Sequence, residues 1–277
     1  MIRSMMAAAL ALVTLAAPAS AQIRWAPNAG THSYRYESIT HVPNAPGSSY
    51  RLDYDLASDG KGGIVAIVTG AWHRERDSGE WSDAEINDAC RAKLHGQGTE
   101  LARVTLSPVP LDQLQGLGPA FMDECAPGDI FFPMTDILKL ALVQLAPQFH
   151  LAELAKPGDS RRFDGHKTGL ERLDTAVSID SPGGTIRLVA LAPERATIDF
   201  APDPTAITII HRRAYSGADV TLTGTDSMGF RVEIDPRTGA LLSAAASQGA
   251  LELTMSLPGG YSQPLAVTHE VSIVPRP

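Results

Sequence analysis

The sequence is poor in aromatic residues and in positive charge. Aromatic side chains make up 6% of the 277 residues, which leaves few flat rings for stacking on bases or sugars. Lys and Arg number 23 against 31 Asp and Glu, so the formal net charge is −8. Such a protein is repelled by phosphate backbones and by anionic lipid surfaces. The composition therefore argues against a nucleic-acid or carbohydrate module.

The common motifs of catalysis and metal binding are also missing. The sequence contains no Gly-x-Ser-x-Gly elbow, no His-Glu-x-x-His motif, no Cys-x-x-Cys pair and no EF-hand loop. Its eight histidines are scattered along the chain, as surface or hydrogen-bonded core histidines usually are. We therefore predict no catalytic residue, no metal site and no cofactor from motifs alone.

Cysteine is nearly absent, with Cys90 and Cys125 the two in the sequence. An oxidising compartment would favour their pairing, and we predict a disulfide between them. Closing this loop would stabilise the fold by roughly 3 to 4 kcal/mol in the chain-entropy description. Two separate buried thiols are the alternative. A catalytic thiol is disfavoured because neither cysteine has a histidine at suggestive spacing.

Long apolar runs are absent beyond residue 21. The longest later stretch, 137–146, is interrupted by Lys139 and Gln144 and stopped by Pro147. A transmembrane helix needs roughly 20 consecutive apolar residues. We therefore predict no membrane span in this part of the chain.

Residues 1–21 have the three parts of a secretory signal peptide. Arg3 gives the positive start, residues 5–17 are apolar, and Ala19-Ser20-Ala21 forms a small-x-small cleavage site. A retained anchor is the alternative, but polar residues and a proline interrupt the run. Gln22 stands where a lipid-anchored precursor would carry cysteine. We predict a mature chain of residues 22–277 that is periplasmic or secreted and has no stable membrane anchor.

The first part of the mature chain predicts β-strands at 33–39, 50–56, 64–72 and 101–106. A glycine-rich loop, Asp59 to Gly63, lies between the second and third of them. Such a loop is typical of a β-hairpin because glycine accepts positive φ without strain. A phosphate-binding loop is the alternative, but it needs a helix after the loop, and the following residues are β-branched.

Two helices are predicted, one before and one after the predicted strand 101–106. Ser82-Asp83-Ala84-Glu85 has the pattern of a capping box and predicts a helix from Asp83 to about His95. The second helix is predicted from Thr135 to Ala146, and it is apolar on almost all sides. Such a helix must be covered, for example by the concave face of a curved sheet.

Beyond a turn at Pro157 to Asp159, alternation of apolar and polar residues recurs in several segments. These segments are 173–179, 186–191, 230–234, 251–255 and 265–273. Turn residues separate them at 181–184, 235–239 and 257–260. The pattern predicts an antiparallel meander.

These elements predict a mainly β fold with two internal helices, an α+β class whose antiparallel meander forms a half-barrel or a curved two-layer sheet. A meander of short strands must close, pair or cover its edges to avoid association. We expect one mature domain, 22–277, with a possible sub-lobe boundary near 156. This arrangement resembles the lipoprotein-carrier type of periplasmic half-barrel, in which a helix lines a concave sheet. The resemblance is one of architecture, and no residue is assigned a role from it.

Three places carry candidate functional residues. His269 lies in the apolar register of the last predicted strand and could orient a ligand or act as a general base. Asp164 and His166 could share a strand face as two metal ligands, although no third ligand is visible. The run Trp72 to Asp77 mixes charges on a predicted surface loop. For each place, an ordinary hydrogen-bonded or solvated role is the alternative.

Two classes of function follow. The first is a non-catalytic periplasmic protein that binds an apolar ligand, such as a lipid, or a segment of an envelope protein. The second is a periplasmic enzyme that uses His269 or the Asp164 and His166 pair. The first class needs only the predicted fold, whereas the second needs residues to converge in space. We therefore favour binding.

Overall fold

The structure is a computed structural model, and it describes residues 28–41, 47–61, 63–75, 79–83, 99–105, 154–172, 175–215, 217–247 and 249–277. Regular structure within these ranges consists of β-strands. The first seven are β1 (Gly30–His41), β2 (Ser48–Ser58), β3 (Gly63–Glu75), β4 (Ser82–Asp83), β5 (Thr99–Thr105), β6 (Ser160–Arg172) and β7 (Thr175–Ala192). The others are β8 (Arg195–Pro202), β9 (Thr205–Tyr215), β10 (Ala218–Asp226), β11 (Gly229–Ile234), β12 (Leu241–Ser247), β13 (Gly249–Leu257) and β14 (Tyr261–Pro275).

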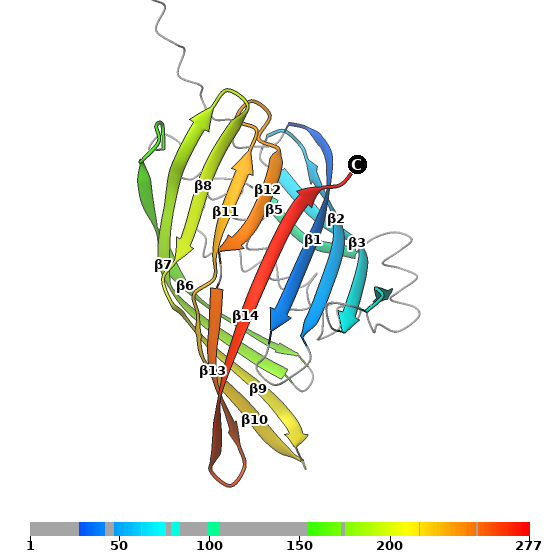
Figure 1. Cartoon of the computed structure of the whole chain (residues 1–277), viewed down its shortest axis with the longest axis vertical. Coiled ribbons are helices and arrows are strands. Elements are labelled where there is room, and N and C mark those ends of the chain that lie inside the picture. The colour runs from blue at the N-terminus through cyan, green and yellow to red at the C-terminus, as the bar shows by residue number, and fades with distance from the viewer. Residues whose placement is uncertain are drawn as a thin grey trace, which may run out of the picture.

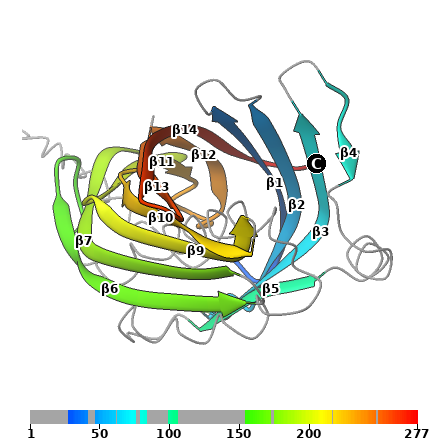
Figure 2. The same cartoon turned by 90° about the horizontal axis from the view of Figure 1, so that it is seen from below.

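All fourteen strands belong to one antiparallel sheet that is strongly curved and partly closed (Figure 2). Its continuous path runs β12-β11-β8-β7-β9-β10-β13-β14-β1-β2-β3-β4, with β6 paired to β7 and β5 paired to β3. The mainly antiparallel β prediction is therefore confirmed, and so is a curved sheet.

Two long strands, β7 and β14, hold this sheet together because each changes partner midway. One edge of β7 pairs with β9 over Thr175–Asp180 and with β8 over Gly184–Ala192. One edge of β14 pairs with β13 over Tyr261–His269 and then with β12 at Ser272 and Ile273. The sheet thus divides between β7 and β14 into an upper branch, β8, β11 and β12, and a lower branch, β9, β10 and β13 (Figure 1).

This division corrects the predicted meander. After β8 in the upper branch, the chain forms β9 and β10 in the lower branch, returns to β11 and β12 above, and descends again to β13. Consecutive strands are neighbours in β1-β2-β3-β4 and in β6-β7-β8, whereas the hairpins β9-β10 and β11-β12 are flanked by strands that do not follow or precede them in the chain. The strands β8, β9 and β10 are additional to those predicted.

The predicted turn at Ser181 to Gly184 is also wrong. Strand β7 continues through these residues, and it changes partner from β9 to β8 there. Gly183 has φ of 102°, and a Cβ on Gly184 would lie 2.4 Å from Cζ of Phe163 and 2.6 Å from the Ala201 carbonyl oxygen. The glycines therefore allow a bend within a strand that is paired on both edges, and the chain does not reverse there.

The remaining turn predictions are confirmed. Between β2 and β3, Asp59 Oδ1 accepts hydrogen bonds from the backbone N–H groups of Lys61 at 2.6 Å and Gly63 at 2.8 Å. Gly60 adopts a φ of 70° in that loop. Turns also occupy 157–158, 236–238 and 258–260. Glycine and an Asx-type hydrogen bond set these reversals locally, which is why the sequence predicts them.

The core of the upper half follows from the strand register. A single row of paired residues crosses β7, β8, β11, β12, β14, β1, β2 and β3, and every member is at most 3% exposed. Its members are Leu188, Ile198, Val232, Ala244, Ile273, Tyr36, Leu52 and Ala71. We call the face that carries this row the inner face, and the opposite face the outer face. Alternation along each strand then assigns the neighbouring residues to the outer face.

The two predicted helices are not confirmed. Ser82 and Asp83 form the short strand β4, paired with His73 and Trp72, and the Ser82 hydroxyl donates to the His73 carbonyl oxygen at 3.3 Å. Asp83 therefore lies in a strand where the sequence predicts the first residue of the helix, and the residues after it lie outside those that the structure describes.

Several other predictions fall outside the described residues. They are the continuation of the first helix to His95, the second helix from Thr135 to Ala146, the disulfide of Cys90 and Cys125, and the signal peptide at 1–21. Within the described ranges, no helix is long and apolar enough to cross a membrane.

Candidate functional site

The inner face of the lower branch carries a cluster of buried apolar side chains, which we call the lower apolar face. It extends across β7, β9, β10, β13 and β14. Six of its residues are 4% to 9% exposed, and three more are partly buried and pack against them. The six are Val177, Ile207, Ile209, Leu251, Leu253 and Val267, and the three are Ile179, Leu222 and Leu265.

Strand register brings these residues together from distant parts of the sequence. Val177 pairs with Ile209, which pairs with Leu222, while Leu253 pairs with Leu265. The intervening outer positions are mainly threonine, serine and glutamate, so the two faces of the branch differ sharply in polarity. Five strands thus present aliphatic side chains on one side, with no charged residue among them.

Gly224 lies within this surface and allows β10 and β13 to approach closely. A Cβ on Gly224 would lie 1.8 Å from the carbonyl oxygen of Glu252, a backbone atom that has no freedom to move aside. A larger residue here would push the two strands apart.

His269 lies on the inner face, between Val267 and Val271 of β14, in the apolar register that the sequence predicts. It is half-buried and pairs with Thr40 of β1, whose Oγ1 lies 3.1 Å from Nδ1 of the imidazole. The donor in this hydrogen bond depends on the imidazole tautomer. The contact fixes the ring on the side of the sheet that carries the lower apolar face, and its role remains a prediction.

Asp164 and His166 lie on β6, which pairs only with β7 among the described strands. Asp164 is exposed and pairs with Gly183, and the backbone of His166 pairs with Ser181. No group of three His, Cys, Asp or Glu residues that could hold a metal ion occurs in the described part of the chain. The described residues add no third ligand to this pair, and the structure does not bring it near His269.

The outer face of β1 and β2 carries an ionic cluster centred on Asp53, which is 3% exposed. Arg35 donates from Nε and Nη2 to the two carboxylate oxygens, at 2.8 and 2.9 Å. Arg276, beyond the end of β14, donates from Nη1 at 2.7 Å. Burial alone would raise the pKa of Asp53, but the hydrogen bonds from both arginines outweigh it and hold this pKa below its ordinary value.

Sequence reasoning missed this cluster, although a signal for it exists. Ser33, Arg35 and Glu37 alternate along β1, and Asp55, Asp53 and Arg51 oppose them in that order along β2. Two neighbouring antiparallel strands with complementary charges in register predict cross-strand ion pairs. The predicted loop at Trp72 to Asp77 is likewise corrected, because Trp72 to Glu75 belong to β3 and alternate between its two faces.

Two buried tyrosines lie on the inner face of the same strands. The rings of Tyr34 and Tyr54 are 5.5 Å apart between centroids. Burial raises the pKa of Tyr34 to about 12, against a smaller opposing effect of its hydrogen bond with the backbone of Leu241. Burial also raises the pKa of Tyr54 well above its ordinary value. Both phenols therefore stay neutral at physiological pH and act as packing groups.

Comparisons with known proteins add little to this description. No protein-family model and no curated protein matches the sequence. Among solved structures, the chain is similar to a LolA superfamily protein from Nitrosomonas europaea, with 11% identity, coverage of 93% of this chain and 90% of that chain, and a TM-score of 0.16. It is also similar to the β domain of the Bordetella autotransporter Brka, with 8% identity, coverage of 88% and 98%, and a TM-score of 0.13. Scores this low carry no argument about fold or function.

Proposed function

We propose that this chain is a non-catalytic, exported binding protein that holds an apolar ligand against the lower apolar face. The ligand is a lipid or acyl chain, or an apolar segment of an envelope protein. The observation that carries the proposal is the continuity of this face across five strands, with Ile179, Leu222 and Leu265 left only partly buried. The signal-peptide pattern at 1–21 supports export to the periplasm or beyond.

The energetics of such binding are favourable. Burying one methylene group contributes about 0.8 kcal/mol, so an acyl chain that buries ten of them gains about 8 kcal/mol, which corresponds to a micromolar Kd. The entropy lost when the acyl chain is ordered makes this free energy of binding smaller. Because no charged side chain lies among the nine residues, affinity for the ligand rests on apolar contact.

The test is a titration of the full chain with a dansyl-labelled fatty acid, followed by dansyl fluorescence. Leu222→Ser removes a partly buried aliphatic group from the middle of the face, and we expect it to weaken binding about tenfold. Thr223→Ser, at the next position on the outer face, is the matched control and should leave the affinity unchanged. Absence of saturable binding to the unaltered protein, or equal weakening by both variants, would contradict the proposal.

A further inference from the structure

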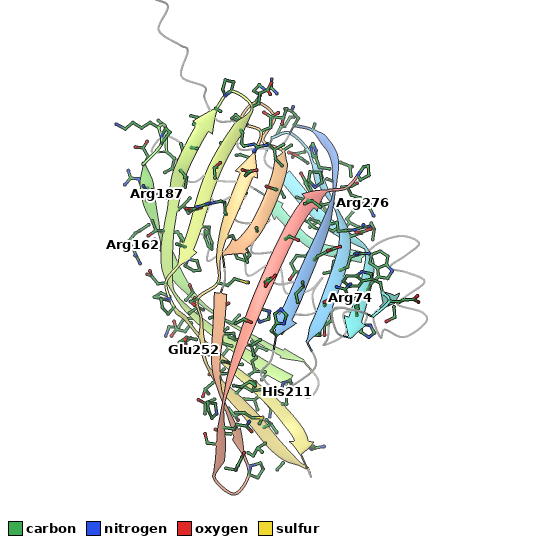
Figure 3. All side chains as sticks on the ribbon, viewed as in Figure 1. Arg74, Arg162, Arg187, His211, Glu252 and Arg276 are labelled. Atoms are coloured by element: carbon green, nitrogen blue, oxygen red, sulfur yellow. The ribbon has the colours of Figure 1, made fainter. Side chains whose placement is uncertain are left out.

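The outer surface of β2 and β3 holds two arginines over one tryptophan. The guanidinium carbons of Arg51 and Arg74 lie 4.2 and 4.7 Å from the ring centroid of Trp81, the residue before β4. Arg51 is neutralised by Glu37, whose Oε1 accepts from its Nε at 2.8 Å. Arg74, labelled in Figure 3, forms no ion pair with any residue in the described ranges. Among the described residues, one positive charge at this place is therefore unbalanced.

Two buried polar atoms beside this charge also lack partners. Nε of Arg74 and Oγ of Ser49 are both inaccessible to solvent and make no hydrogen bond. Ser49 is 1% exposed, and it is the direct register partner of Arg74, so both side chains lie on the outer face. Buried donors without acceptors are rare because each has lost its water without replacement. The two residues are register partners on the same face, so one acceptor oxygen that reached both atoms would satisfy both.

We propose that Arg74, Ser49 and Trp81 form a binding site for a carboxylate group. A carboxylate accepts hydrogen bonds only, and its two oxygens match the edge of a guanidinium formed by Nε and one Nη. One oxygen bonds to Nε of Arg74 and to the hydroxyl of Ser49, and Trp81 forms the apolar wall.

Charge favours a carboxylate over phosphate at this site. Glu37 already balances Arg51, so a carboxylate with one negative charge would make the group of Arg51, Arg74 and Glu37 neutral. A dianionic phosphate would give this group a negative charge, in a chain whose net charge is already −8. The site lies on the outer face of the sheet, so it is separate from the proposed apolar site and does not depend on it. The carboxylate comes either from a free small molecule or from an acidic side chain of a peptide.

The test follows the Nε–H signal of Arg74 in nitrogen–proton NMR spectra of the full chain. The signal is assigned as the one lost in Arg74→Lys. Titration with sodium acetate should shift it saturably, and sodium chloride at equal ionic strength should not. A blocked tripeptide, Gly-Glu-Gly, is the second probe. Tighter binding of the tripeptide than of acetate identifies a peptide side chain as the source, and equal binding identifies a small carboxylate.

Two variants separate a binding role from a structural one. Ser49→Ala should weaken acetate binding about tenfold while keeping the cooperative thermal transition, since it removes a hydroxyl that bonds to nothing in the free protein. Arg187→Lys is the control, because Arg187 is an exposed outer-face arginine that, like Arg74, has no ion pair in the described part of the chain. It should leave the acetate response intact. A shift that chloride reproduces, or a Ser49→Ala response equal to that of the unaltered protein, overturns the proposal.

Discussion

Asp53 links three segments of the chain through one buried carboxylate. Arg35 reaches it from β1 and Arg276 from the residues after β14, so the C-terminal end of the sheet is fastened to its N-terminal hairpin. The backbone N–H of Arg276 also donates to the carbonyl oxygen of Ser33 at 2.8 Å. Loss of the carboxylate would remove the ion pair of Arg35 and leave Arg276 paired with Asp55, whose Oδ1 lies 3.5 Å from Nη2 of Arg276.

We predict that Asp53→Asn lowers the free energy of unfolding by about 2 to 3 kcal/mol in urea denaturation. This is less than for a fully buried pair, because both arginines reach solvent. The control is Asp199→Asn, whose bidentate partner Arg231 is exposed, and it should cost under about 1 kcal/mol. Equal effects of the two variants would show that burial of Asp53 is unimportant.

The same carboxylate gives a pH dependence. Since the folded pKa of Asp53 lies below the ordinary value of 3.8, its stabilisation is present above that value and is lost as the pH falls through the folded pKa. Urea midpoints measured from neutral to acidic pH should fall more steeply below about pH 4 in the unaltered protein than in Asp53→Asn. Parallel curves would contradict the assignment.

Tyr34 gives the opposite dependence, at alkaline pH. Its folded pKa of about 12 lies above the unfolded value of 10.0, so its contribution is complete below pH 10.0 and is lost as the pH rises toward about 12. The loss is on the order of 2 to 3 kcal/mol. Tyr34→Phe should unfold at higher pH than the unaltered protein, as followed by circular dichroism against pH. Tyr261→Phe, at an exposed tyrosine, is the control and should leave the midpoint unchanged.

At the scale of the element, β7 shows why a local pattern can be misread. Ser181-Pro182-Gly183-Gly184 has the composition of a hairpin turn, and the sequence around it carries no sign of the neighbours on either side. Strand β6 pairs with one edge of β7, while β9 and β8 pair in succession with the other. These long-range pairings keep the chain extended, and the glycines supply a bend where the two branches separate.

We predict that Gly183→Ala destabilises the protein by about 2 to 3 kcal/mol, because φ is 102° there and a Cβ would lie 2.3 Å from the Phe163 carbonyl oxygen. Gly169→Ala on the adjacent strand β6 is the control. The nearest atom to its Cβ would be 3.6 Å away, so the change should stay within about 0.5 kcal/mol. Urea denaturation measures both, and a tolerated Gly183→Ala would contradict the bend.

Across the whole molecule, the sequence predicts strands whose apolar positions alternate with more polar ones, as in β11 and β14. It misses β10, where Gly224 takes a place in the apolar register and leaves only Val220 and Leu222 to mark the alternation. The division into two branches is also beyond local patterns, because it depends on which distant hairpins become neighbours. His269 could be assigned to the apolar register in advance, whereas the lower apolar face could not, since its nine residues come from five strands.

The central claim is that this face holds an apolar ligand, and native mass spectrometry tests it most directly. The chain should be produced with its own residues 1–21, purified without detergent from the compartment in which it accumulates, and measured in its folded state. The account predicts a mass above that of the polypeptide, with the excess released on denaturation and identified as lipid or as an apolar peptide. A folded protein that carries only the polypeptide mass would contradict it.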